Sequence, residues 1–218
     1  MFTNAPPSGR DLSTPVCLIL STLQFKSAIM PAYYTDETFD AHTFPEDLSS
    51  SEFEGCTFNN CHFSNANLSG CKFEDCSFSH CDFSNARLTK AVFQEVEMEG
   101  CKLLGLDFQL CNPFGFSIRF QACQLDHSNF LGMKLRRCSF DGCQLNGVDF
   151  AEADAEKVSF RESHLRDTLF ERTNLQQADF RGASHLRIDP VENRLKGARF
   201  SKDSVMGLLE RFGVKVEG

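Results

Sequence analysis

The stretch from Phe53 to Val92 contains two copies of one twenty-residue sequence. Phe53–Lys72 reads FEGCTFNNCHFSNANLSGCK, and Phe73–Val92 reads FEDCSFSHCDFSNARLTKAV. Aligned without gaps, ten of the twenty positions are identical, and both copies carry Phe, Phe, Phe and Leu at five-residue intervals. Repeats of this length are typical of solenoids, in which each repeat packs only on its neighbours.

A five-residue unit underlies the longer repeat and extends along most of the chain. Its centre is a large apolar residue, and a small residue, mostly Cys or Ala, lies two positions earlier. Two inward residues separated by one outward residue describe an extended segment. An unbroken strand would keep a period of two, so the chain must turn a corner in every unit. A twenty-residue repeat therefore predicts four units per coil and a four-sided solenoid. The centres are Phe53, Phe58, Phe63, Leu68, Phe73, Phe78, Phe83, Leu88, Phe93, Met98, Leu103, Phe108, Phe120, Leu125, Phe130, Leu135, Phe140, Leu145, Phe150, Phe160, Leu165, Phe170, Leu175, Phe180, Leu195 and Phe200.

Composition excludes several classes of protein. The 218 residues include 23 Phe, 2 Tyr and no Trp, which indicates one repeated core environment. The net charge of −8 argues against binding nucleic acid by neutralising its phosphates. No apolar run approaches the length of a membrane span, about 18 residues, and no convincing signal peptide precedes the repeats. We therefore expect a cytoplasmic protein with no direct contact to nucleic acid or membrane.

Cysteine is common, and ten of the eleven cysteines lie at the small inward position of the unit. Their spacing of five or ten residues differs from that of zinc sites, and His62 and His80 fall on outward positions. Cys61, Cys81 and Cys101 should stack one strand spacing apart, where parallel side-chain directions are poor for a disulfide. We expect buried, reduced thiols and no metal or cofactor; accidental metal binding or oxidation is the alternative.

The first segment outside the repeat is the leader, residues 1–29. It has no five-residue period and carries a charge of +1. We expect the folded unit to begin at Met30 and to run through residues 30–200, with residues 1–29 as a disordered leader or a misassigned start. A functional leader is the alternative.

The second segment is the stretch 109–119, where the register shifts by two residues between Phe108 and Phe120. The sequence CNPFGF at the shift suits a turn. It is either a tolerated insertion or a contact loop formed by Pro113, Phe114 and Phe116. The two phenylalanines cannot both face inward with regular spacing.

The third segment is the tail, residues 201–218. Its apolar residues follow the spacing of an amphipathic helix, which Ser201 or Asp203 can cap and Gly213 can end, before a short alternating strand. The tail is either a cap over the last coil alone or a cap that also joins two chains in a homodimer. The residues assigned to that interface are Val205, Leu208, Leu209, Phe212, Val214 and Val216.

Charge is unevenly divided. From Met30 to Leu110 there are 14 acidic and 4 basic residues, a net of −10, whereas Cys111 to Gly218 has 15 acidic and 16 basic residues, a net of +1. Twenty-residue spacing places like charges opposite each other in the first part, which is destabilising. They form either a solvated face or a surface for a basic partner; the candidates are Glu54, Glu74, Asp75 and Glu95. The second part should stack opposite charges, such as Glu152 with Arg172, Arg136 with Glu156 and Asp179 with Arg199.

No catalytic constellation emerges from the sequence. His127, His164 and His185 lie on outward or irregular positions without a matching nucleophile pattern, and there is no glycine loop suited to phosphate. A rod packed with Phe and Leu offers no obvious pocket. We therefore expect a protein that is not an enzyme.

The units ANLSG, ADFRG, ARLTK and CDFSN resemble the pentapeptide-repeat family. The resemblance covers roughly residues 37 to 200 and implies an all-β fold. That fold is a right-handed four-sided β-helix of about eight coils, closed by a C-terminal capping helix and a short strand. Within the family, the length, the unbroken coil stack and the ending RIDPVENRLKGARFSKDSVMGLLERFGVKV resemble the Qnr-type quinolone-resistance proteins and the related albicidin-resistance protein.

That resemblance implies a function. Such proteins form tail-to-tail dimers that mimic DNA, bind DNA gyrase or topoisomerase IV, and protect it from inhibitors. Two features fit less well, since the acid lies far from the expected dimer axis and the prominent Qnr loops are absent. The alternative is a general interaction scaffold whose partner is unrelated to topoisomerase.

Overall fold

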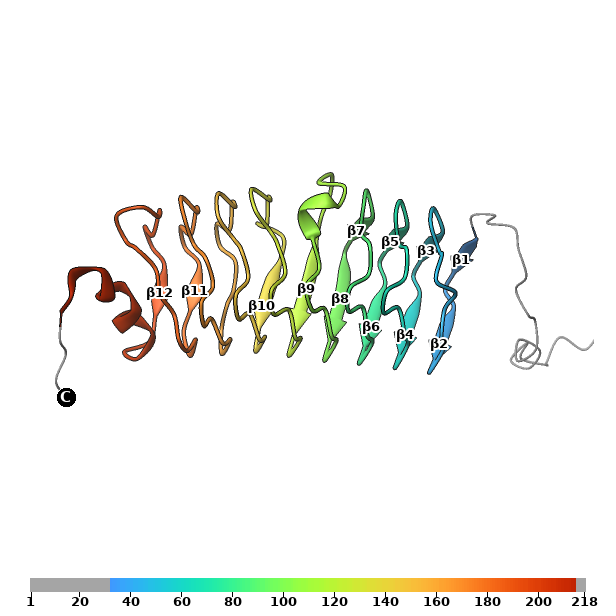
Figure 1. Cartoon of the computed structure of the whole chain (residues 1–218), viewed down its shortest axis with the longest axis horizontal. Helices are drawn as coiled ribbons and strands as arrows, with labels where there is room; N and C mark the ends of the chain where they lie inside the picture. Colours follow the sequence, from blue (N-terminus) through green and yellow to red (C-terminus); the bar gives the residue numbers. More distant parts are fainter. Residues whose placement is uncertain (1–31, 215–218) are drawn as a thin grey trace, which may run out of the picture.

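The computed structural model describes residues 32–214, which wind into a rod of parallel coils (Figure 1). There are about eight turns, with the first coil at one end of the rod and the C-terminal segment at the other. This is the all-β solenoid that the repeat predicts. The predictions for residues 1–29 and for Val216 lie outside the described residues.

We number the four sides of each coil in chain order. Side 1 is a sheet in the order β1-β3-β5-β7, and side 2 is a sheet in the order β10-β9-β8-β6-β4-β2, with the pair β11-β12 at the C-terminal end. Sides 3 and 4 are held by single bridges between coils, such as His62 with Asp82 and Asn67 with Arg87. The strands are β1 Tyr33–Thr35, β2 Thr38–Asp40, β3 Glu52–Glu54, β4 Thr57–Asn59, β5 Lys72–Glu74, β6 Ser77–Ser79, β7 Val92–Gln94, β8 Val96–Glu99, β9 Ile118–Gln121, β10 Ser139–Asp141, β11 Asp179–Phe180 and β12 Arg199–Phe200.

The register between coils confirms both the twenty-residue repeat and its interruption. Phe53 pairs with Phe73, twenty residues on, whereas Met98 pairs with Phe120, which is twenty-two residues on. The two extra residues therefore lie between β8 and β9. The segment there begins with a short 3₁₀ helix, η1 (Phe108–Leu110), and projects from the rod (Figure 1).

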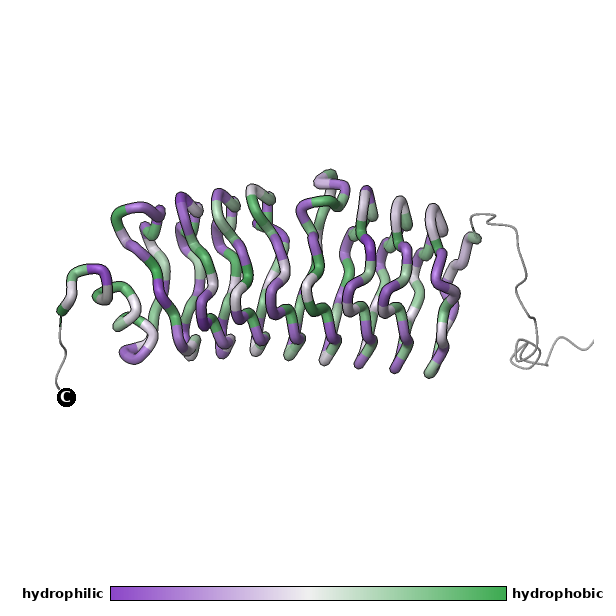
Figure 2. The backbone as a smooth tube through the Cα atoms, in the orientation of Figure 1, coloured by the Kyte–Doolittle hydropathy of each residue, from purple (hydrophilic) through white to green (hydrophobic). Residues whose placement is uncertain are grey.

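The core consists of aromatic columns. The rings of Phe58 and Phe78 stack at 4.5 Å between centroids and 5° between planes, while Phe53 and Phe58 in one coil meet edge-on at 72°. Strands of neighbouring coils lie about 4.8 Å apart, so rings on successive coils stack in an attractive geometry. Polar and apolar residues alternate along each side because only every second side chain faces the core (Figure 2).

A corner follows two residues after each centre, and there the backbone takes a positive φ. Gly55 has φ +63°, and an added Cβ would lie 2.4 Å from Oδ1 of Asp36. Asn60 at +52° and Asn65 at +60° occupy equivalent corners. Asn tolerates this conformation, and Gly adopts it without strain, so the corner explains the Gly, Asn and Asp of the repeat.

The C-terminal segment differs from the prediction. It forms two 3₁₀ helices, η2 (Ser204–Leu208) and η3 (Glu210–Phe212), in place of one amphipathic α-helix. The N–H of Ile188 in the last coil donates to the carbonyl of Gly207 at 3.4 Å. The Gly207 carbonyl thus bonds to the last coil and not within a helix. The segment is also too short to be a stable α-helix by itself. Gly213 ends it with φ +61°, as predicted, but Val214 is not in a strand.

Candidate functional site

A groove of about 530 Å³ lies between the last coil and the C-terminal segment. Its lining includes Ser184, His185 and Leu209. The Ser184 hydroxyl oxygen lies 2.7 Å from Nδ1 of His164, one coil earlier, a pair that the twenty-residue spacing could have revealed. No hydrogen bond among residues 32–214 joins a carboxylate to this histidine, so the pair lacks the group that orients the base in hydrolases.

Within the described part of the chain, no group of three or more His, Cys, Asp or Glu side chains could hold a metal ion. No helix between residues 32 and 214 is long and apolar enough to cross a membrane.

The ten cysteines of the repeats are free and buried. Several small inward side chains donate to the coil before them, and the Cys71 thiol donates to the carbonyl of Leu48 at 2.9 Å. The Ser163 hydroxyl makes the same bond to the carbonyl of Phe140 at 2.6 Å. The sequence interpretation treated these cysteines as small apolar residues and missed this donor role, which Cys, Ser and Thr share.

Burial also sets the chemistry of the thiols. It raises the pKa of Cys71, Cys76 and Cys138 to about 12, because a thiolate is poorly solvated in the core. In the column that contains Cys61 and Cys101, hydrogen bonds to neighbouring thiols, together with burial, raise the pKa of both residues.

We expect none of the ten repeat cysteines to react with a thiol reagent in the native protein at neutral pH. The thiolate is the reactive species, and burial both suppresses it and excludes the reagent. All eleven cysteines of the chain should react in guanidinium chloride. Rapid native labelling of a repeat cysteine, located by mass spectrometry, would contradict the buried register.

The candidate acidic residues Glu54 and Glu74 do stack, on adjacent strands of side 1. Each has a neighbour that offsets the repulsion. The Tyr33 hydroxyl donates to Glu54 at 2.7 Å, and the Lys72 ammonium lies 2.5 Å from Glu74. These contacts therefore explain in part why two glutamates can stack here. The sequence interpretation had attributed the stacking to a partner surface or to a solvated face.

The other two candidates, Asp75 and Glu95, lie at the corners after β5 and β7. Glu95 forms an ion pair with Arg137 across two coils. Asp75 is exposed and forms no ion pair within residues 32–214. The sequence placed Asp75 opposite Glu95 and did not identify Arg137 as the partner of Glu95.

The expected ladders of opposite charge are present in part. Arg172 binds Glu152 at 2.6 Å, and Arg136 binds Glu156 at 2.8 Å. Asp179 pairs in register with Arg199, but its carboxylate binds Arg181 at 2.6 Å instead, which lowers the pKa of Asp179. Exposed pairs of this kind add little stability, typically about 0.2–1 kcal/mol.

Side 1 shows a polarity that the sequence did not reveal. We call its surface before the insertion, with the corner that follows each strand, the acidic half; it holds six acidic residues and one basic residue, a net of −5. The continuation after the insertion is the basic half, with six basic and two acidic residues, a net of +4. The acidic half comprises Asp36, Glu52, Glu54, Lys72, Glu74, Asp75 and Glu95, and the basic half Lys134, Arg136, Arg137, Asp154, Glu156, Lys157, Arg194 and Lys196.

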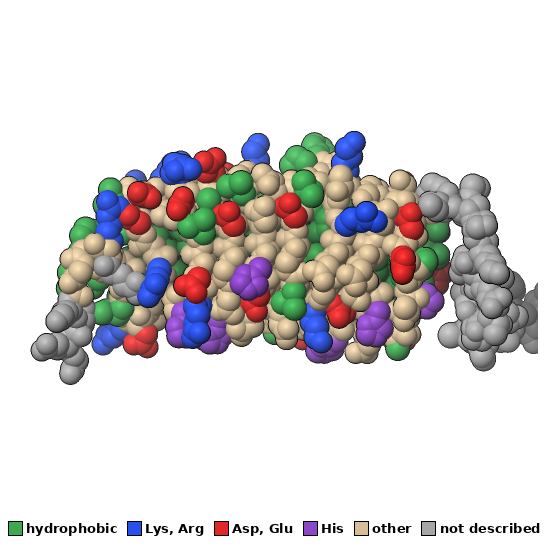
Figure 3. Space-filling view, in the orientation of Figure 1, with side chains coloured by type: hydrophobic (Ala, Val, Ile, Leu, Met, Phe, Trp, Pro, Cys, Tyr) green, Lys and Arg blue, Asp and Glu red, His purple; other side chains and the backbone are tan. Residues whose placement is uncertain are grey.

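The predicted contact loop separates into inward and outward residues. Phe116 is buried and packs against Phe93 and Phe108 at 6.4 and 6.2 Å, so it is a core residue and not a contact. Phe114 is 80 % exposed, and Pro113 is exposed beside it. Hydrophobic side chains gather where this loop projects (Figure 3).

The predicted dimer residues lie at the C-terminal end of the rod. Val205, Phe212 and Val214 are exposed, whereas Leu208 and Leu209 are half-buried against the last coil. The segment is held there by an ion pair between Arg211 and Asp189. It therefore packs on the coil and leaves Val205 and Phe212 exposed, while Val214 lines the groove.

The fold is a parallel four-sided β-solenoid, and its charged columns and projecting loop lie on its outer sides. A chain built in this way from stacked coils is a repeat protein. This chain belongs to the pentapeptide-repeat family, since the sequence model of the pentapeptide repeat region matches residues 51–130 and 133–208. No curated protein sequence matches the chain.

Solved structures show the same fold. Two trypsin-treated variants of QnrB1, described as a plasmid-mediated fluoroquinolone resistance protein, superpose with TM-scores of 0.57 and 0.52. Their sequence identities are 20 % and 22 %; the matches cover 85 % and 87 % of this chain and 100 % of each QnrB1 chain. At this identity the likeness extends to the fold, which is Qnr-like.

Proposed function

We propose that this protein is a non-enzymatic interaction protein that binds bacterial type II topoisomerase, in particular DNA gyrase, and protects it from inhibitors such as quinolones. The fold likeness to QnrB1, a fluoroquinolone resistance protein, supports the choice of partner. Topoisomerase IV, the related enzyme, is included in the proposal.

The observation that carries the proposal is the acidic half of side 1. Glu52 and Glu54 are exposed there, and Glu99 extends the negative charge onto side 2, where Glu97 is paired with Arg119. Carboxylates on strands about 4.8 Å apart present closely spaced negative charge along a rod. A topoisomerase surface that binds DNA phosphates is basic, so it is complementary to this region.

The C-terminal residues fit a second part of the proposal, a tail-to-tail homodimer. Exposed Val205, Phe212 and Val214 all belong to the C-terminal segment at the end of the rod, where a two-fold axis would join the same segment of both chains. Such a dimer doubles the length of the rod and places an acidic half toward each end.

The basic half favours a second candidate function, a general interaction scaffold. The basic half of side 1 has a net charge of +4. A DNA mimic that binds a uniformly basic surface gains no binding energy from this positive charge. A scaffold uses both halves, each for a partner of opposite charge. The two candidates differ in whether gyrase binds at all.

Reversing charge in the acidic half tests the proposed contact. We expect the double variant Glu52→Lys with Glu54→Lys to bind gyrase subunits at least about tenfold more weakly than the wild type, because steering and complementarity both reverse. Binding is measured by surface-immobilised gyrase titration at two salt concentrations, since screening should weaken the wild-type contact. The same variant should lose protection in a quinolone-inhibited supercoiling assay.

The matched control changes the same charge on another side. Glu171→Lys with Glu192→Lys alters two exposed glutamates of side 4, and its affinity should stay near that of the wild type. Equal losses of gyrase affinity in the two variants would show that the acidic half is not the contact surface. A wild type that does not bind either gyrase subunit at tens of micromolar would leave the scaffold as the function.

A further inference from the structure

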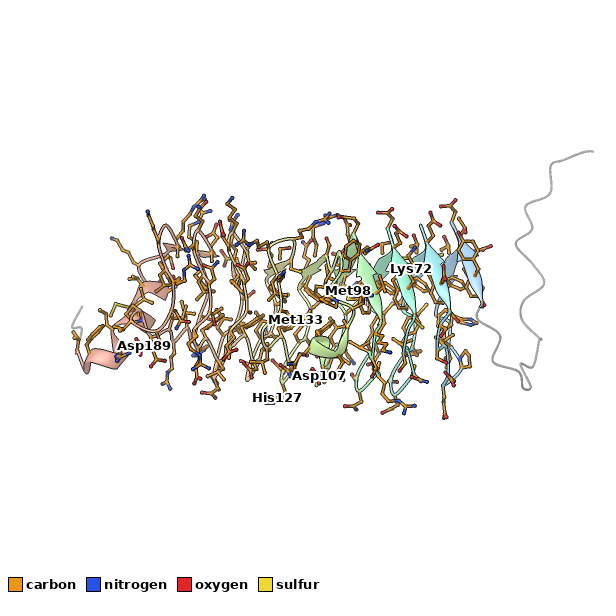
Figure 4. The ribbon with its side chains drawn as sticks, turned by 90° about the horizontal axis from the view of Figure 1, so that it is seen from above. Lys72, Met98, Asp107, His127, Met133 and Asp189 are labelled. Carbon is orange, nitrogen blue, oxygen red and sulfur yellow. The ribbon has the colours of Figure 1, made fainter. Side chains whose placement is uncertain are left out.

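Side 1 is divided into two equal halves of opposite charge. Four layers lie before the insertion, with Tyr34, Phe53, Phe73 and Phe93 at their centres, and the acidic half covers them. Four layers follow it, with Leu135, Ala155, Leu175 and Leu195 at their centres, and the basic half covers these. Figure 4 shows this polarity along the upper edge of the rod, where side chains end in oxygen toward the N-terminal end and in nitrogen toward the C-terminal end.

An apolar group marks the midpoint. Phe114 lies in the layer between the two halves, with its carbonyl held by the side-chain amide of Gln94 at 3.2 Å. Its side chain is 80 % exposed, and that of Leu110 in the same loop is 49 % exposed. A large exposed apolar side chain at the centre of a charged surface is the arrangement of a protein interface, in which an apolar centre is surrounded by a polar rim.

We propose that side 1 binds side 1 of a second copy of this chain, in an antiparallel dimer whose two-fold axis passes beside Phe114. A two-fold axis across the rod direction reverses each rod and keeps every column of side chains opposite its own copy. The acidic half of each chain then faces the basic half of the other, and the two Phe114 rings meet at the centre.

One pair of layers places opposite charges directly across the interface. The third layer faces the seventh, so Lys72 lies opposite Asp154, and Asp75 lies opposite Lys157. Within one chain, neither Asp75 nor Lys157 forms an ion pair with another described residue. These two residues therefore gain a partner in the dimer.

One column brings like charges together. Glu74 faces Glu156, but Lys72 already binds Glu74 at 2.5 Å and Arg136 binds Glu156 at 2.8 Å. Each carboxylate thus enters the interface with its own counter-charge. The first layer faces the ninth, where Arg194 lies opposite Tyr33 and Lys196 lies opposite Thr35, next to Asp36.

The dimer should be weak. Nine layers at about 4.8 Å and a side of three or four residues give an area of roughly 400–600 Å² per chain, at the low end for specific interfaces. The contact uses side 1 and leaves the C-terminal end free, so it is compatible with a tail-to-tail dimer. It does not rest on the proposed function, although a basic partner would compete with the second copy for the acidic half.

Cysteine cross-linking tests the position of the axis. In a Cys17→Ser background, Phe114→Cys supplies one exposed thiol, since the ten repeat cysteines are buried. Two thiols beside a two-fold axis should join as a disulfide when diamide oxidises them, the diamide taking up the two electrons and two protons. The control is Val191→Cys, which is 69 % exposed at wild type but lies on side 4. We expect at least about tenfold more covalent dimer from the first variant; equal yields would overturn the proposal.

A charge swap tests the pairing independently. Asp75→Lys alone places two lysines opposite each other, and Lys157→Asp alone places two aspartates opposite each other. By sedimentation equilibrium at low salt, each single variant should dimerise at least about tenfold more weakly, and the double variant should recover to within about threefold of the wild type. All four proteins are checked for the same circular dichroism. Single variants that dimerise like the wild type, as a purely tail-to-tail dimer would, contradict the side-1 dimer.

Discussion

Replacing Phe140 with Ala is expected to lower the free energy of unfolding by about 3–5 kcal/mol. The ring is fully buried and lies between Phe120 and Phe160 of the neighbouring coils, at 5.1 and 5.4 Å. It also meets Phe130 and Phe150 edge-on, both at 5.3 Å. Neighbouring coils are held by their backbone ladders and cannot collapse into the space, so the cavity would persist.

The matched control is the next residue, Asp141→Ala. Its side chain is outward and half-buried, and it accepts a hydrogen bond from the Ser159 hydroxyl. The loss should be under about 1 kcal/mol, as for a partly solvated polar contact. Urea unfolding of both variants, followed by circular dichroism, measures the difference. Equal losses would mean that the inward register of side 2 is wrong.

Replacing Gly207 with Ala is expected to displace the C-terminal segment from the last coil. An added Cβ would lie 1.8 Å from the carbonyl oxygen of Leu186 and 2.7 Å from its carbonyl carbon. These are backbone atoms of a buried contact, so the neighbour cannot rotate away as a flexible side chain could. Overpacking of this kind costs about 1–3 kcal/mol, and detachment of the segment is the cheaper response.

Limited trypsin digestion measures that detachment. Cleavage after Lys202 and Arg211 should become faster in Gly207→Ala, whereas the coils before β12 remain protected. Gly213→Ala is the control, because its Cβ would meet nothing within 4 Å and the only cost is its φ of +61°, about 1–2 kcal/mol. Equal digestion of Gly207→Ala and wild type would show that the segment does not dock through Gly207. If the tail-to-tail dimer forms, Gly207→Ala should also weaken it.

The repeat made the fold predictable in detail. A five-residue period with a twenty-residue super-repeat fixes which side chain faces inward, and Phe53, Phe73 and Phe93 lie in one column as expected. Local chemistry decides which side chains face inward, because every unit has the same inward pair and the same corner. No contact between distant parts of the chain is needed to choose between alternatives. The two-residue shift before Phe120 was also visible, because it breaks the same period.

The candidate surfaces were predicted less well, because their partners come from other coils and from irregular segments. Glu54 and Glu74 stack as the spacing predicts, but the hydrogen bond from Tyr33 depends on a first coil outside the regular period. The ion pair of Glu95 with Arg137 spans the insertion. Long side chains choose among several neighbours, and spacing alone does not rank them.

By itself, therefore, the sequence determined the four-sided coil, its inward residues, the buried cysteines and the place of the interruption. Periodic apolar residues can be buried in only one way when every unit must turn a corner. Only the tertiary structure decided that Phe116 points inward while Phe114 points outward, and that the tail forms 3₁₀ turns against Leu186. The division of side 1 into an acidic and a basic half also became visible only there, since charges twenty residues apart share a surface once the coils stack.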